Sequence, residues 1–181
     1  MPCMPRLQWP TPVHVAAGAS PPPPTASVVA DPHVTGFNGT KFSLQALGWT
    51  DLLSTPGLAL AAQLVAAPVA GTSWVHAARL GASGTQLSIS IGTTGITTGG
   101  TTTHQLVAKL GGATVKPGSS LTLKGISVRL APGGKQLVAT ASSPATGLVM
   151  VRVGLGTGPV SKKPFLNIFV TLPGPPTQAL R

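Results

Sequence analysis

The sequence predicts an all-β fold, an antiparallel β-sandwich or open barrel behind a disordered proline-rich N-terminal arm. Short apolar runs rich in Val, Ile, Leu and Thr recur roughly every ten residues. Gly and Pro pairs separate most of these runs, and 23 Gly and 19 Pro in 181 residues favour many turns and little helix. We therefore expect a proline-rich disordered linker over residues 1–27, one β domain over residues 28–172 and a disordered tail over residues 173–181.

The N-terminal arm contains Ser20 followed by four prolines, Pro21 to Pro24. Consecutive prolines restrict φ and lack N–H donors, so we expect polyproline II or disordered chain up to about residue 30. The serine and four prolines resemble the repeat of extensin-type wall glycoproteins, although a generic stiff spacer is the simpler interpretation. Residues 1–9 lack the apolar stretch of a signal peptide, so either the chain is not secreted by that route or a longer linker continues upstream of Met1.

Residues 31–44 predict the first hairpin of the fold, which we expect to anchor the sheet. Asn38-Gly39 is a strong signal for a two-residue type I′ turn, because both residues tolerate positive φ. Phe42 and Leu44 alternate with Ser43 on the returning strand, as in a half-buried strand.

The remaining strands are predicted from alternation and from turn residues. Leu58, Leu60 and Leu64 are expected to point inward, and so are Leu87, Ile89 and Ile91 in the strand after an 82–85 turn. Residues 92–103 read as a long polar Thr/Gly loop that would make contacts. The expected strands are 49–54, 58–65, 74–80, 86–91, 105–110, 113–115, 121–123, 126–130, 136–141, 148–153 and 165–172.

The first hairpin resembles the opening of von Willebrand factor type D domains. The matching residues are Asp31, Pro32, His33, Gly36, Phe37, Gly39 and Phe42, whereas Ala30 and Asn38 replace the usual Gly and Asp. The pattern of residues 74–91 and 123–128 is similar to plant and algal members of the root-cap kind. The resemblance implies a non-catalytic structural or interaction module of an extracellular matrix, cell-wall or cell-surface protein. The chain departs from secreted members in having a single cysteine, Cys3, so it forms no internal disulfide.

The charge of the chain is one-sided, with 12 Lys and Arg against Asp31 and Asp51 and a net charge of +10. The basic residues are scattered and not interleaved with aromatics, so the pattern favours a generally basic surface over a specific nucleic-acid site. Acidic polysaccharide and other extracellular proteins are the expected partners. No apolar run of about 18 residues occurs, so the sequence predicts no membrane span.

The sequence predicts neither an enzyme nor a metal or cofactor site. His14, His33, His76 and His104 lack the spacing of a zinc site, and two carboxylates are too few for a calcium site. No nucleophile motif, phosphate loop or paired catalytic carboxylates are visible. The Asp31-Pro32 bond is acid-labile and splits in some members of the resembled family. A self-cleaving domain therefore stays an alternative to a purely structural role, in which Asp31 bonds nearby backbone and Pro32 begins a strand. A carbohydrate- or polyanion-binding β domain is the other alternative.

Two surface roles remain open from the residues alone. Trp49 and Trp74 would stack on sugar rings if exposed, although a buried tryptophan in a β core is the commoner outcome. Asn38-Gly39-Thr40 is a glycosylation sequon, which matters only if the chain is secreted, and turn chemistry alone also explains it.

Overall fold

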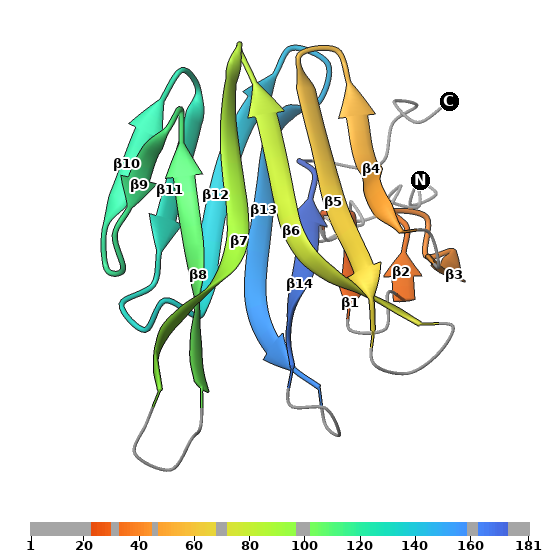
Figure 1. The fold of residues 1–181 in the computed structure, drawn as a ribbon. Coiled ribbons are helices and arrows are strands. Elements are labelled where there is room, and N and C mark those ends of the chain that lie inside the picture. The colour runs from red at the N-terminus through yellow and green to blue at the C-terminus, as the bar shows by residue number, and fades with distance from the viewer. Residues whose placement is uncertain are drawn as a thin grey trace, which may run out of the picture.

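The structure, a computed structural model, describes residues 23–29, 33–44, 47–67, 72–96, 102–158 and 163–173. All regular elements in these ranges are β-strands, and they form two antiparallel sheets that pack face to face (Figure 1). Each sheet has two free edge strands, so neither closes into a barrel. The all-β prediction is confirmed, and the sandwich is the form that the chain adopts.

Sheet A has eight strands and combines both ends of the described chain. The N-terminal strand pairs with the last strand, so that Thr25 lies opposite Thr171 and Val28 opposite Ile168. In spatial order the strands are β10 (Ser120–Leu123), β11 (Ile126–Leu130), β12 (Gln136–Ser143), β13 (Gly147–Thr157), β14 (Pro164–Thr171), β1 (Thr25–Val29), β2 (His33–Thr35) and β3 (Lys41–Ser43).

Sheet B has six strands that follow one another in chain order. They are β4 (Gly48–Thr55), β5 (Leu58–Ala66), β6 (Ser73–Ala82), β7 (Thr85–Ile96), β8 (Thr102–Leu110) and β9 (Ala113–Val115). The chain thus moves from sheet A to sheet B after β3 and returns after β9. No helix long and apolar enough to cross a membrane occurs in the ranges that the structure describes.

The core lies between the two sheets and consists of the alternate aliphatic residues of each strand. In sheet B the predicted inward leucines Leu58, Leu60 and Leu64 are all at most 2% exposed. Leu87 and Ile89 are also buried, and Ile91 packs against the core while partly exposed. Because side chains alternate between faces along a strand, the residues between these point outward. The outer face of each sheet is therefore formed by these alternate residues.

Tight turns connect the strands at the end of the sandwich where β6 passes into β7. Ser83-Gly84, Gly111-Gly112 and Lys124-Gly125 each have positive φ at both residues and join directly paired strands, as in type I′ turns. In Pro56-Gly57 positive φ occurs at the glycine, as in a type II turn. The Ser143 hydroxyl donates a 2.8 Å hydrogen bond to the Pro56 carbonyl and so connects the two sheets at this end.

The predicted type I′ turn at Asn38-Gly39 is wrong. Thr35 pairs with Lys41, and beyond this pair the Gly36 N–H donates a 2.8 Å hydrogen bond to the Thr40 carbonyl oxygen. Three residues, 37–39, therefore remain in the hairpin loop. Positive φ occurs at Gly39 and not at Asn38, whose side-chain oxygen instead accepts a 3.0 Å bond from Thr40 N. The arrangement is a type I turn followed by a left-handed glycine, the three-residue hairpin loop. The side-chain bond gives asparagine an alternative to the left-handed conformation.

Three further expectations need correction. The strand predicted to begin near residue 28 begins at Thr25, directly after the prolines, because residues 25–29 again have N–H groups and pair with β14. Within the expected 92–103 loop, residues 92–96 belong to β7 and residues 102–103 to β8, in keeping with the preference of threonine for extended backbone, whereas residues 97–101 lie outside the described residues. The β2–β3 hairpin does not anchor sheet A but lies at its edge, where all three residues of β3 are exposed.

Candidate functional site

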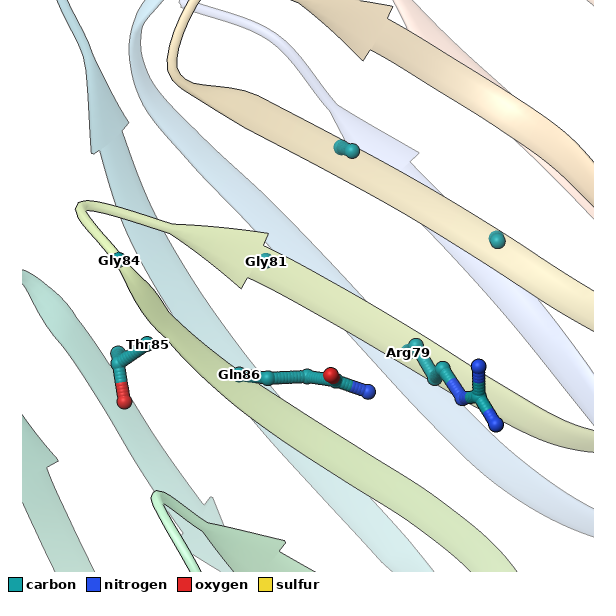
Figure 2. A pocket seen from close by; sticks show the side chains of 7 residues that line it. Arg79, Gly81, Gly84, Thr85 and Gln86 are labelled. Atoms are coloured by element: carbon teal, nitrogen blue, oxygen red, sulfur yellow. The ribbon is translucent and has the colours of Figure 1, made fainter.

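The outer face of sheet B contains an open depression of about 420 Å³ (Figure 2). Its floor is made of small residues that the register places side by side, because Gly81 of β6 pairs with Ala59 of β5. On its other side Gly81 pairs with Gln86 of β7. Absent or short side chains leave the sheet surface low at this point. The lining residues are Ala59, Ala61, Arg79, Gly81, Gly84, Thr85 and Gln86.

Arg79 forms one side of the depression and stacks on a tryptophan. The guanidinium carbon lies 3.7 Å from the centroid of the Trp49 ring. Arg79 pairs with Ala61 of β5, and Ala61 pairs in turn with Asp51 of β4, so Arg79 and Trp49 come from the two strands on either side of β5. A cation over an aromatic face at an exposed site is stabilised by about 0.5–1 kcal/mol, which restricts the guanidinium to one place.

The arrangement is suited to binding an anionic group. A guanidinium presents a planar set of N–H donors that bind a carboxylate or sulfate through two parallel hydrogen bonds. In Figure 2 the Gln86 side chain lies beside Arg79 on the same side of the sheet, and Gln86 pairs with Gly81 of the neighbouring strand β6. Its amide supplies further donors and an acceptor. Asp51 is exposed on the β4 side of Ala61 and disfavours an anion there, so the Gln86 side is the favoured one.

The two tryptophans have different environments. Trp49 is 40% exposed, but one face of its ring is covered by Arg79, so in this structure the guanidinium occupies the surface on which a sugar would stack. Trp74 is half-buried and packs against Phe165 of sheet A, with ring centroids 5.8 Å apart and ring planes at 53°. Trp74 thus contributes to the packing between the sheets.

The residues of the type D-like motif lie far from this depression in the fold. His33, Gly36, Phe37, Asn38, Gly39 and Phe42 belong to the β2–β3 hairpin of sheet A, whereas the depression is on sheet B. His33 Nδ1 and the Ser43 hydroxyl are 3.2 Å apart, and Asn38 is exposed at the turn as a sequon residue must be. Asp31 and Pro32 lie outside the described residues. The proposed cleavage and glycosylation therefore stay predictions.

Sequence reasoning did not identify Arg79, Gly81 and Gln86 as site residues. The available signal was weak: Ala59, Ala61 and Gly81 occupy outward positions of two strands, where larger polar residues are usual. Only the register shows that these small residues adjoin one another and that Arg79 reaches Trp49. In the described ranges no three His, Cys, Asp or Glu side chains come together as a metal site.

Comparison of the chain with protein-family models gives no match, and comparison with curated proteins gives none either.

Proposed function

We propose that the protein is a non-catalytic interaction module that binds acidic polysaccharide through the depression on sheet B. The observation that carries this proposal is the Arg79 guanidinium held against Trp49 beside a floor of alanine and glycine. The stacked guanidinium loses little freedom on binding an anionic group, and the low floor leaves room for a sugar ring to approach the backbone. The net charge of +10 attracts a polyanion over longer distances.

An extracellular matrix or cell-surface location is part of the proposal. It is supported by the likeness of residues 31–44 to type D domains and by the serine-tetraproline segment, which resembles wall glycoproteins. Acidic polysaccharides are partners that such a location supplies. A structural role alone would not require an arginine fixed beside an open depression.

Binding of dextran sulfate and polygalacturonate, measured by titration calorimetry with neutral dextran as the reference, tests the proposal. Arg79→Gln should weaken binding roughly tenfold, because hydrogen bonds to charged groups contribute about 1.5–3 kcal/mol and this site is exposed. Arg79→Lys should bind with intermediate affinity, since lysine keeps the charge but lacks the planar pair of donors.

The matched control is Lys116→Gln, which removes the same charge from an exposed residue after β9, outside the depression. It should change the affinity much less than Arg79→Gln does. Equal losses in the two variants would mean that only net charge matters and that sheet B holds no site.

A further inference from the structure

The outer face of sheet A carries a row of exposed basic and apolar side chains, which we call the arginine row. Arg129 of β11 pairs with Val138 of β12, Val138 pairs with Arg152 of β13, and Arg152 pairs with Phe169 of β14. Residues directly opposite each other in a sheet point to the same face. Their neighbours in sequence, such as Val151 and Val153, are buried in the core, so this row points outward.

The row places cationic and apolar groups in alternation. Val138 and Phe169 are 37% and 38% exposed, and both arginines are exposed. Neighbouring strands are about 4.8 Å apart, so the Cα atoms of Arg129 and Arg152 lie about 10 Å apart. Phe169 on one side of Arg152 and Val138 on the other offer apolar surface to the carbon face of a sugar ring.

The adjoining row on the same face is rich in hydroxyl groups. Thr122 and Ser127 share a 2.7 Å hydrogen bond, and Thr25 and Thr171 lie 3.5 Å apart. Such groups both donate and accept hydrogen bonds, which suits the hydroxyls of a sugar. The row consists of Thr122, Ser127, Thr140, Met150, Thr171 and Thr25.

Charge complementarity decides the class of occupant. Asp51, the acidic residue of the described ranges, belongs to sheet B, so the described residues of this face of sheet A include basic side chains and no carboxylate. The arginine row continues in register through Ser27 and Thr35 to Lys41, so it crosses the strands from β11 to β3. A line of this kind fits an extended anionic chain better than a compact anion.

We propose that the outer face of sheet A binds a second chain of acidic polysaccharide, so that one molecule cross-links two chains. The cross-linking part of this inference rests on the proposed function of the sheet B face. The binding surface on sheet A is argued from the residues of sheet A alone. The two sheets pack through their inner faces, so the two outer faces point in opposite directions (Figure 1). Two polymer chains are then held on opposite sides of the sandwich without competing for space.

The test combines stoichiometry with cross-linking. A short sulfated dextran oligosaccharide, titrated in a calorimeter, should bind the unchanged protein at two sites per molecule. Long dextran sulfate mixed with the protein should scatter light because the protein joins polymer chains. The double variant Arg129→Gln/Arg152→Gln should lose the sheet A site and the scattering, and Arg79→Gln should weaken the sheet B site roughly tenfold and reduce the scattering.

A double variant with an equal loss of charge, Lys116→Gln/Lys135→Gln, should keep both sites and the scattering, because its residues lie in loops after β9 and β11. Circular dichroism confirms that each variant folds. Two sites and full scattering in Arg129→Gln/Arg152→Gln would overturn the inference, even if Arg79→Gln weakens the sheet B site. If Arg129→Gln/Arg152→Gln loses a site while Arg79→Gln binds like the unchanged protein, the sheet B function and the cross-linking are overturned. The binding surface on sheet A would then remain. Stronger competition by single-stranded DNA than by the oligosaccharide would make sheet A a nucleic-acid surface and also overturn the inference.

Discussion

Gly81 offers a substitution that should stabilise the fold while it blocks the depression on sheet B. Gly81 lies within β6, and its φ is outside the left-handed region. A Cβ atom built there would meet nothing closer than the carbonyl oxygens of Ala59 and Thr85, both at 4.0 Å. A side chain therefore fits, and in Gly81→Val it would project from the floor into the space beside Arg79.

The expected gain in stability follows from the backbone. Glycine in the middle of a strand is destabilising by about 0.5–1 kcal/mol relative to alanine, because it loses more conformational freedom on folding. Valine is favoured further in strands, within a scale that spans about 1 kcal/mol. Since the added Cβ atom meets only ordinary van der Waals contacts, Gly81→Val should raise the free energy of unfolding by about 1 kcal/mol in urea denaturation.

Binding should change in the opposite direction. The three added carbon atoms occupy the depression of about 420 Å³ at its floor, so a sugar ring can no longer approach Gly81 and reach Arg79 together. The affinity of the sheet B depression for sulfated dextran oligosaccharide should fall roughly tenfold, a loss of about 1.4 kcal/mol. It is measured in the Arg129→Gln/Arg152→Gln background so that the sheet A surface does not contribute.

Gly95→Val is the matched control, because Gly95 also lies in a strand, has no positive φ and has open space around its Cβ position. It is near the other end of β7 and should leave the affinity unchanged. A Gly81→Val protein that is more stable yet binds as tightly as the unchanged protein would refute the assignment of the depression as the binding site. A less stable one would refute the reasoning on the backbone.

Two predictions concern the core and the contact between the sheets. Leu80→Ala, at a residue that is 0% exposed, should lower the free energy of unfolding by about 3–5 kcal/mol in urea, because it removes buried contacts and leaves a cavity; a loss below 1 kcal/mol would contradict this packing. Ser143→Ala should cost about 1–3 kcal/mol, since the buried hydroxyl donates to Pro56 O at 2.8 Å and accepts from Ala145 N at 3.2 Å. Its exposed neighbour serves as the control, and Ser142→Ala should melt within about a degree of the unchanged protein.

Much of the secondary structure could be predicted because it depends on local pattern. Leu58, Leu60 and Leu64 are spaced by even numbers of residues and lie between the turn residues Pro56-Gly57 and Pro68 in the sequence. Both their strand and their burial could therefore be predicted from the residues. The Ser83-Gly84 turn was located for the same reason. The errors at Asn38-Gly39 and at residues 92–103 arise where two local structures are both available to the same residues, and pairing with a neighbouring strand selects one.

The candidate sites could not be predicted in the same way. Arg79 and Trp49 are separated by 29 intervening residues, and no local signal connects them. Likewise Arg129, Val138, Arg152 and Phe169 form one row only because four strands share a register. Exposed residues on the outer face of a sheet follow no periodicity beyond alternation, so their composition does not indicate which of them are neighbours.

The sequence by itself determined that the chain forms strands, where most of them lie and which faces become the core, because alternation and turn residues act over a few positions. Tertiary structure alone decided that Thr25–Val29 pairs with β14 across most of the chain, that β2 and β3 form an edge, and that Arg79 lies on Trp49. These features depend on which distant strands become neighbours and in which register. That choice is made by burial of the whole core, and the surface sites follow from it.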